Sequence, residues 1–294
     1  MLYFFGCYKE NYEEGSNLGD YMYKDIFLHY FKNTPMTVDH KNHFPKYSNK
    51  IKKTDIVVFG GGGIFYEKKE NINYFQKCHI ILQKIKCSYY FLSIGFQFSQ
   101  FKFGKNDLSG TIFIELIPFI ENAKFIYCRS IIDEIILKKY NKNCKYAPDL
   151  CFSLFLINLL PPRNQISIKK NIITIGSFNH FKTYFTILHQ LIEMGFVHYH
   201  LVFSKDDEFP ISKWEEFLSG HQPILMKENS ILNYKNVFEN SSYVYTSRFH
   251  GFCFAKLLHV EHIIPILPTF KIATFVNHNE IESKKQLDLL KNIL

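Results

Sequence analysis

Short apolar segments that alternate with helix-like segments restrict the fold of this chain more than any other feature. Each apolar run is followed by a loop and then by residues with helical spacing, which is the pattern of β-α units around a parallel sheet. In the first half, strands are expected in LYFFGCY, TDIVVFG, CSYYFLSIG, AKFIYCR and CKYAPD. Five such units in about 150 residues favour a doubly wound sheet, because a closed barrel requires eight.

A second series of β-α units fills the rest of the chain, with strands expected in NIITIGS, HYHLVFS, SYVYTS and EHIIPI. Between the two series, Pro161, Pro162 and a polar stretch interrupt the apolar pattern. We therefore expect an α/β protein with two Rossmann-like doubly wound domains, residues 1–163 and 164–294, that face a cleft. Ligands of such sheets bind at the carboxyl ends of the strands, so each candidate site is judged by that position.

Composition and charge exclude several functional classes. Hydrophobic residues make up 47% of 294 residues, which predicts a packed core. The net charge of +8 suits an acidic ligand, an anionic glycan or a membrane surface, but no basic block with interleaved aromatics indicates nucleic acid. No signal peptide or membrane span is evident, which predicts a cytoplasmic protein and leaves peripheral association with the inner face of a membrane open. Seven cysteines without a CxxC pair predict buried thiols, and no metal site is expected.

A run of four glycines follows an expected strand directly in DIVVFGGGGIFYE. It matches neither a Walker loop, since no Gly-Lys-Ser/Thr follows, nor a GxGxxG fingerprint, so a nucleotide is not indicated. Glycines such as Gly61 and Gly62 allow positive φ and close approach of the backbone. These properties serve a ligand or a tight strand-to-helix turn, and the sequence leaves both open.

Polar residues separate the first expected strand from the first expected helix in EEGSNLGDYMYKD. Asp20 is suited to cap the helix, with Gly19 supplying the bend. In the functional alternative, Asn17 and Asp20 point across the cleft, and the carboxylate accepts a proton or a hydrogen bond from a sugar hydroxyl.

Arg129 ends an expected strand and opens a helix in KFIYCRSIIDE. It is either a surface residue that pairs with Asp133 one turn on, or a guanidinium fork that binds a carboxylate or phosphate beside a helix N-terminus. Asp149 follows Pro148 at the end of another expected strand, where it could orient an arginine or a loop.

Arg248 and His250 stand where a strand gives way to a helix in YTSRFHGFCFAKLL. Cations beside the exposed N–H groups of a helix start are unfavourable by a few tenths to about 1 kcal/mol each. An anion removes that conflict, so the sequence predicts an anion pocket formed by these two residues and a closely approaching Gly251. His250 can donate a proton near neutral pH.

Two further histidines, His198 and His200, alternate on one expected strand, and the acidic run Asp206, Asp207 and Glu208 follows it. The group could bind a cation, but no further ligand stands at a diagnostic spacing. A solvated loop is the favoured interpretation.

The order of these motifs resembles the polysaccharide pyruvyl transferase family. The sequences NLGD, GGGGIF, SIGF, CRS, APD, SRFHGFCFAKLL and PTFK follow one another over nearly the whole chain. The resemblance implies a GT-B-like architecture and an enzyme of polysaccharide biosynthesis, such as that of capsule or exopolysaccharide. Such enzymes move a pyruvyl group from phosphoenolpyruvate to two sugar hydroxyls, giving a cyclic ketal and phosphate.

The resemblance implies the roles of Arg129, Arg248, His250 and Lys271, and the motifs described above predict those of the remaining residues. Donor binding falls to Arg129, Arg248, Gly251 and Lys271, and the catalytic acid that protonates phosphoenolpyruvate is His250. Asp20 is the expected base. Acceptor or loop positions fall on Asn17, Gly19, Gly61, Gly62, Ser93 and Asp149. Phosphoenolpyruvate enters as a substrate without any cofactor, and the acceptor is a glycan or a lipid-linked or nucleotide-linked sugar.

Two alternatives keep the same architecture. A glycosyltransferase would bind a nucleotide-sugar diphosphate at the same helix N-terminus, and a non-catalytic protein of a glycan pathway would bind an anion there without turnover. The chain departs from the family after the RxHG element, where HVEHIIP replaces a small Gly-Pro turn, and it is compact. These departures bear on the acceptor more than on the donor.

Overall fold

The computed structural model forms two compact units, and the predicted α/β class with two Rossmann-like parallel sheets is confirmed. It describes residues 1–6, 18–97, 108, 111–163, 169–208, 210–266 and 279–294. Unit 1 comprises the described residues within 1–10, 23–159 and 274–294, and unit 2 those within 11–22 and 160–273.

The sheet of unit 1 has six parallel strands in the order β2-β1-β3-β4-β5-β6, the doubly wound order in which the chain direction across the sheet reverses between β1 and β3. The strands are β1 (Leu2–Gly6), β2 (Met36–His40), β3 (Ile56–Tyr66), β4 (Ser88–Gln97), β5 (Phe125–Cys128) and β6 (Cys144–Tyr146).

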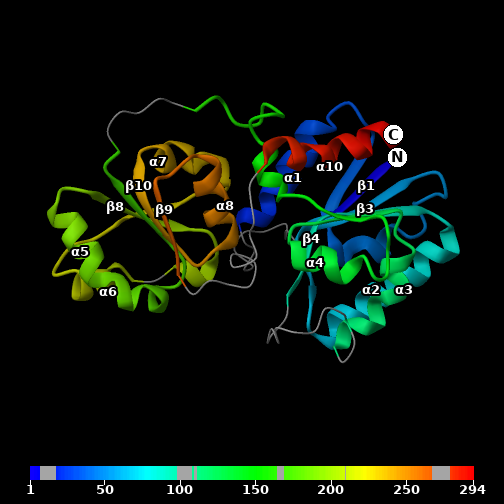
Figure 1. Cartoon of the computed structure of the whole chain (residues 1–294), viewed down its shortest axis with the longest axis horizontal. Coiled ribbons are helices and arrows are strands. Elements are labelled where there is room, and N and C mark those ends of the chain that lie inside the picture. The colour runs from blue at the N-terminus through cyan, green and yellow to red at the C-terminus, as the bar shows by residue number, and fades with distance from the viewer. Residues whose placement is uncertain (7–17, 98–107, 109–110, 164–168, 209, 267–278) are drawn as a thin grey trace. The chain divides into compact units, whose positions relative to one another are not determined.

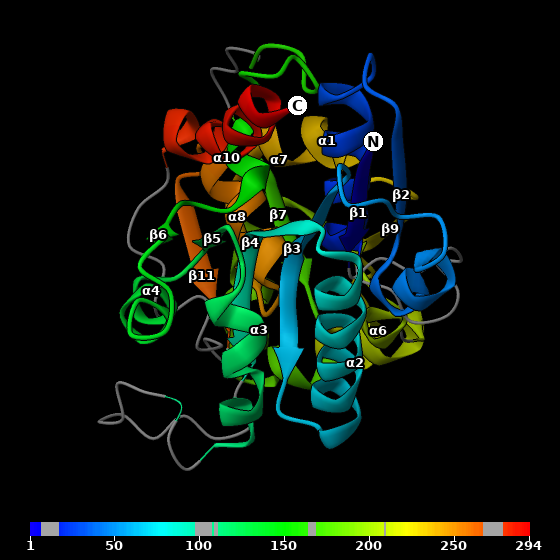
Figure 2. The ribbon, with the colours of Figure 1, turned by 90° about the vertical axis from the view of Figure 1, so that its right-hand side faces the viewer.

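Helices cover both faces of this sheet (Figure 1). On one face lie α1 (Leu18–Tyr30) and α10 (Glu280–Ile293), and on the other α2 (Lys69–Ile85), α3 (Ile117–Glu121) and α4 (Ile131–Leu137). Successive side chains of a strand point to opposite faces. Phe4 accordingly stacks on Phe27 of α1, with ring centroids 3.7 Å apart, whereas Phe59 contacts Phe75 of α2 on the other face. Figure 2 shows α2 alongside β3.

The sheet of unit 2 has five parallel strands in the order β11-β10-β7-β8-β9. They are β7 (Asn171–Ile175), β8 (Val197–Val202), β9 (Ile224–Lys227), β10 (Ser241–Thr246) and β11 (His262–Pro265). Helices α5 (Phe185–Glu193) and α6 (Ile211–Phe217) cover one face, and α7 (Lys235–Glu239) and α8 (Phe249–Leu257) the other (Figure 1). The strand order reverses between β7 and β10, and such switch points are where doubly wound sheets bind ligands.

The contiguous division into residues 1–163 and 164–294 does not describe these units. The chain passes from unit 1 to unit 2 after Leu159, and the C-terminal helix α10 belongs to unit 1. The physical reason is that α10 buries Leu287 and Leu290 completely and bonds the first sheet through Gln286. The boundary between the two observed units also passes through α1, whose first five residues belong to unit 2.

Six of the cysteines lie in the described ranges, and all six are buried, as predicted. Burial raises the pKa of the Cys78 thiol to about 12 and that of Cys87 to about 11, so neither is a nucleophile at neutral pH. Within the same ranges, no helix has the length and apolar character needed to cross a membrane.

Candidate active site

The start of α8 holds Arg248 in an ion pair with a carboxylate of the chain itself. Arg248 is the N-cap residue, and its Nε lies 3.0 and 3.2 Å from the two carboxylate oxygens of Asp207. Its Nη2 also donates to Asp207 and, at 2.6 Å, to the hydroxyl of Ser204. The anion expected at this helix start is therefore supplied in part by Asp207, which is completely buried. The interpretation of the acidic run as a solvated loop is wrong for Asp207, although the Asp206 side chain is 85% exposed.

Asp207 also organises the loop that follows β8. One carboxylate oxygen accepts hydrogen bonds from the backbone amides of Phe203 and Ser204, at 3.1 and 3.2 Å. Burial raises the pKa of this carboxyl, and Arg248 and the two amides oppose that rise. The carbonyl of Phe203 in turn accepts from the amide of Leu18 at 2.7 Å. One loop thus holds both Arg248 and the first residue of α1.

These bonds leave one edge of the Arg248 guanidinium available. The side chain is 22% exposed, and within the described part of the chain Nη1 makes no hydrogen bond. An arginine whose other nitrogens are fixed by a carboxylate loses little further freedom when it binds an anion. Arg248 is therefore an oriented cation at a helix N-terminus.

His250 packs directly against Gly19 of the NLGD sequence. The histidine is 4% exposed, and a Cβ atom at Gly19 would lie only 2.0 Å from its Nδ1. Only glycine leaves room for this ring. Asp20, the next residue, is partly buried in the first turn of α1, where the helix dipole favours a carboxylate. Two residues expected in this region, Asn17 and Lys271, lie outside the described residues.

Replacing Gly19 with Ala tests whether this contact positions His250. The added methyl group would overlap the imidazole ring, so the ring must move. If His250 is the catalytic acid, we expect turnover to fall at least about tenfold, because small misplacements of reacting groups are costly. The imidazole NMR signals of His250 should shift in the same variant. Unchanged turnover together with shifted NMR signals would show that His250 takes no part in the chemical step.

Close packing explains why residue 251 is a glycine. A Cβ at this position would lie 2.8 Å from both the Ile175 Cδ1 and the Thr246 Oγ1 atoms, so glycine lets α8 approach β7 and β10. The Thr246 hydroxyl also accepts from the amide of Arg248 at 3.0 Å. This packing fixes the strand-to-helix turn that carries Arg248, and a donor contact by Gly251 stays a prediction.

A histidine and a serine that sequence reasoning missed lie at the switch point of unit 2. Ser247 follows β10, and its hydroxyl is 2.9 Å from the Nδ1 of His180. Gly176 follows β7 and packs so closely that a Cβ there would lie 2.2 Å from the Ser247 hydroxyl. The signal in the sequence was the segment SFNH, which follows the strand NIITI after a single glycine, Gly176.

In unit 1, Arg129 forms a buried ion pair at the carboxyl edge of the sheet. Its Nη1 lies 3.4 Å from Asp149, and the two side chains are 3% and 0% exposed. Asp149 therefore orients an arginine, as the sequence suggested. The surface interpretation of Arg129 is wrong. Asp133 is itself buried and accepts from the amide of Phe96 at 3.5 Å.

Residues from distant parts of the chain surround this pair. The hydroxyl groups of Tyr23 and Ser93 donate to Asp149 at 2.5 and 3.3 Å. Burial, and then the Asp149 charge, raise the pKa of Tyr23 well above its usual value, so Tyr23 stays a neutral donor. Gln286 accepts from the amide of Ser93 at 3.0 Å. The structure thus brings Arg129, Asp149 and Ser93 together, as buried parts of one polar cluster.

The glycine run allows close packing beside this cluster. Gly61 has a φ of +73°, and a Cβ there would lie 2.5 Å from the ring of Tyr23. Gly62 also has a positive φ, of 103°, as expected for this run. Gly61 thus leaves room for the Tyr23 ring. The run lies within β3 (Ile56–Tyr66) and not in a strand-to-helix turn, so that interpretation is wrong, and a ligand role stays a prediction.

His198 and His200 are core residues of unit 2. Both bond the hydroxyl of Thr174 at 2.9 Å, and His200 also bonds the carbonyl of Asp207 at 2.9 Å. Burial lowers the pKa of His198 to about 3 and that of His200 to about 4, so both are neutral at pH 7. No group of three or more potential metal ligands occurs among the residues that the structure describes.

These two histidines predict acid sensitivity. Their folded pKa values lie below the ordinary value of 6.5, so the unfolded chain binds more protons between these limits. The free energy of unfolding should therefore fall as the pH drops from 6.5 towards 4, by up to about 1.4 kcal/mol per pH unit for each histidine. Urea denaturation of the His198→Gln variant should show a shallower pH dependence, and the exposed control His262→Gln an unchanged one. If the free energy of unfolding of His198→Gln depended on pH as that of the wild type does, buried His198 would not be a cause of the acid sensitivity.

Comparison with known proteins gives this geometry a context. A family model described as polysaccharide pyruvyl transferase matches residues 9–266. The chain belongs to the polysaccharide pyruvyl transferase family. The match includes the segments that carry Gly19, Arg129, Arg248 and His250. Members of this family are transferases, and this pyruvyl transferase homologue is accordingly an enzyme of that class.

Solved structures with the same fold are distant in sequence. A putative UDP-N-acetylglucosamine 2-epimerase from Listeria monocytogenes has a TM-score of 0.57 and 11% identity, over 99% of this pyruvyl transferase homologue and 87% of that chain. The UDP-GlcNAc 2-epimerase from Methanocaldococcus jannaschii has a TM-score of 0.54 and 12% identity, over 92% and 90%. These similarities establish the GT-B-like fold. No curated protein sequence matched the chain.

Proposed function

We propose that this pyruvyl transferase homologue moves a pyruvyl group from phosphoenolpyruvate to two hydroxyls of a sugar in a polysaccharide or in its lipid-linked or nucleotide-linked precursor. The observation that carries the proposal is the start of α8, where Asp207 orients Arg248 and His250 packs on Gly19 of the NLGD segment. Both elements come from motifs that the family match spans.

The charges of Arg248 and Arg129 suit the proposed donor. Phosphoenolpyruvate carries a carboxylate and a phosphate, and Arg248 at the N-terminus of α8 can neutralise one of them. Arg129 is the proposed second cation. Its ion pair with Asp149, whose carboxylate also accepts from the Tyr23 and Ser93 hydroxyls, fixes the guanidinium before substrate binds, which lowers the entropic cost of binding.

The reaction then needs a proton donor and a proton acceptor. In the proposed mechanism His250 protonates the methylene carbon of phosphoenolpyruvate, and the adjacent carbon becomes electrophilic. The first sugar hydroxyl adds to that carbon and releases its proton to Asp20. The second hydroxyl adds to the same carbon and breaks the bond to phosphate, which leaves with the second hydroxyl proton. The cyclic ketal and inorganic phosphate are the products, and the proton on Asp20 restores His250.

A nucleotide-sugar glycosyltransferase is the second candidate, because the structural relatives include epimerases that act on UDP-GlcNAc. Thermal shift measurements with phosphoenolpyruvate and with UDP-GlcNAc separate the two candidates. A ligand at a hundred times its dissociation constant adds about 2.7 kcal/mol to the free energy of unfolding. We expect a shift with phosphoenolpyruvate that is lost in Arg248→Met. A shift with UDP-GlcNAc alone would favour glycosyl transfer.

A further inference from the structure

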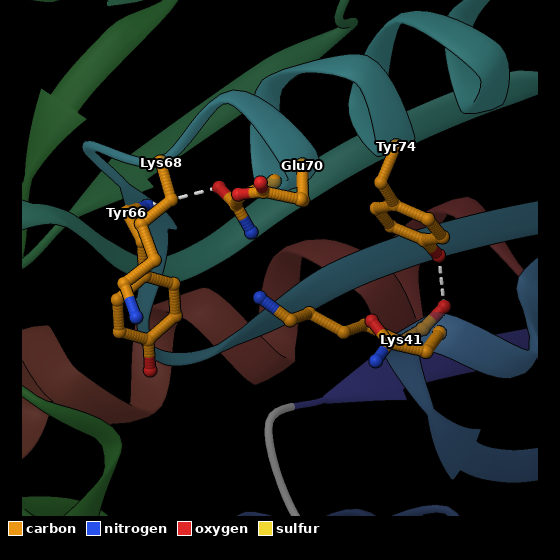
Figure 3. Close-up of a pocket in the computed structure, with 7 residues that line it drawn as sticks. Lys41, Tyr66, Lys68, Glu70 and Tyr74 are labelled. Atoms are coloured by element: carbon orange, nitrogen blue, oxygen red, sulfur yellow. Dashed lines mark hydrogen bonds between the residues drawn. The ribbon is translucent and has the colours of Figure 1, made fainter.

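A pocket of about 420 Å³ opens in unit 1 at the carboxyl ends of β2 and β3 (Figure 3). It is lined by Lys41, Asn42, Tyr66, Lys68, Glu70, Asn71 and Tyr74. These residues come from the start of the 3₁₀ helix Lys41–Tyr47, the end of β3 and the first turns of α2. The volume falls within the range of small-molecule sites, about 300–1,000 Å³, and the position is the edge where such sheets bind ligands.

The base of this pocket holds a buried cation. Lys41 is only 6% exposed, and Figure 3 shows its side chain reaching between Tyr66 and Tyr74. Its ammonium donates to the carbonyl of Ile64 at 3.1 Å and lies 4.7 Å from the centre of the Tyr66 ring. Among the described residues, no carboxylate forms an ion pair with it. Burying a charge without a counter-ion is costly, so the pocket is suited to an anionic ligand.

The walls of the pocket are fixed before any ligand binds. The Tyr74 hydroxyl donates to the backbone carbonyl of Lys41. The Asn71 side chain accepts from the amide of Tyr66 at 2.9 Å and donates to Ile64 at 3.2 Å. Tyrosine rings offer flat apolar surface with little loss of conformational entropy, and the amides and the exposed Glu70 can bond hydroxyl groups. This combination matches a sugar ring that carries a negative group.

We propose that this pocket binds an anionic sugar unit of the acceptor, with its carboxylate or phosphate on Lys41 and its ring against Tyr66 or Tyr74. The proposal rests on the proposed transfer to a glycan and narrows the acceptor to a charged one. Lys68, which is the N-cap of α2 and makes no side-chain capping bond, adds a second cation at the rim.

Calorimetric titration of the whole chain, without phosphoenolpyruvate, tests this proposal. The probes are glucuronic acid and N-acetylglucosamine 1-phosphate, with glucose and inorganic phosphate as references. We expect at least one anionic sugar to bind ten or more times more tightly than both references. The Lys41→Met variant should lose at least tenfold in that affinity. The control Lys84→Met, an exposed lysine in the last turn of α2, should bind as the wild type does.

Melting temperatures keep the test decisive if a variant folds poorly. Removing an uncompensated buried charge should leave the melting temperature of Lys41→Met unchanged or higher. A lower melting temperature with unchanged sugar affinity would make Lys41 structural and overturn the proposal. Equal affinity for inorganic phosphate and for the sugar phosphate would overturn the proposed contact between the sugar ring and Tyr66 or Tyr74. The titration contains no phosphoenolpyruvate, so absence of sugar binding would contradict the proposed pocket but not pyruvyl transfer. Conversely, failure of pyruvyl transfer with sugar binding retained would contradict the proposed reaction but not the pocket.

Discussion

Replacing Asp207 with Asn is expected to lower the free energy of unfolding by about 3 kcal/mol. The substitution leaves Arg248 without its carboxylate, and breaking a buried ion pair costs about 3–5 kcal/mol. The lower end applies because the Arg248 side chain is 22% exposed and water screens part of its charge. The variant also weakens the acceptor of the Phe203 and Ser204 amides, so the loop after β8 should loosen. Urea denaturation followed by circular dichroism measures the loss.

The neighbouring residue provides a matched control. Asp206 is 85% exposed and lies 4.0 Å from Arg248, so Asp206→Asn should change the free energy of unfolding by no more than about 0.5 kcal/mol. Equal effects of the two substitutions would contradict the view that Asp207 is the anion that holds Arg248 in place.

Replacing His250 with Gln is expected to reduce pyruvyl transfer by about 10² to 10⁴-fold, the usual contribution of a positioned general acid. Glutamine keeps much of the shape of the ring and can still hydrogen bond, but it cannot supply a proton. Phosphoenolpyruvate affinity should change much less, because the oriented Arg248 remains. Initial rates of phosphate release, together with calorimetric titration of the donor, separate the two effects.

Two controls accompany this prediction. His262→Gln alters an exposed histidine of the same unit and should leave the rate unchanged. In deuterated water, the wild-type product should carry one deuterium in the pyruvyl methyl group, since the transferred proton exchanges with solvent. If His250→Gln kept the wild-type rate, the acid would have to be another group.

The buried β-α units could be predicted from the sequence because their strands are runs of apolar residues, which are typical of buried strands. The edge strands β2 and β9 were missed, since most of their residues are partly or fully exposed and their apolar residues are few. Helix α10 could not be assigned to unit 1 because the hydrogen bond from Gln286 to Ser93 joins residues 193 positions apart. Amphipathic spacing predicts that a helix has a buried face, but not which sheet receives it.

The candidate site was predictable where the signal is local. Residues at strand-to-helix junctions, such as Arg129, Arg248 and His250, stand out by their position at the carboxyl end of a strand. Asp149, 20 positions from Arg129, was expected to orient an arginine or a loop. The partner of Arg248 was not predictable, because Asp207 lies 41 positions away along the chain. The electrostatic conflict at the start of α8 was correctly identified, but its resolution by an internal carboxylate required the fold.

The most direct test of pyruvyl transfer is mass spectrometry of candidate acceptors after incubation with phosphoenolpyruvate, with phosphate release followed in parallel. The acceptors should include glycans and sugar precursors with uronate or phosphate groups. The account predicts an added carboxyethylidene mass on an acceptor, phosphate released in equal amount and only with acceptor present, and loss of both in His250→Gln. Binding of phosphoenolpyruvate without any pyruvylated product across that panel would contradict it.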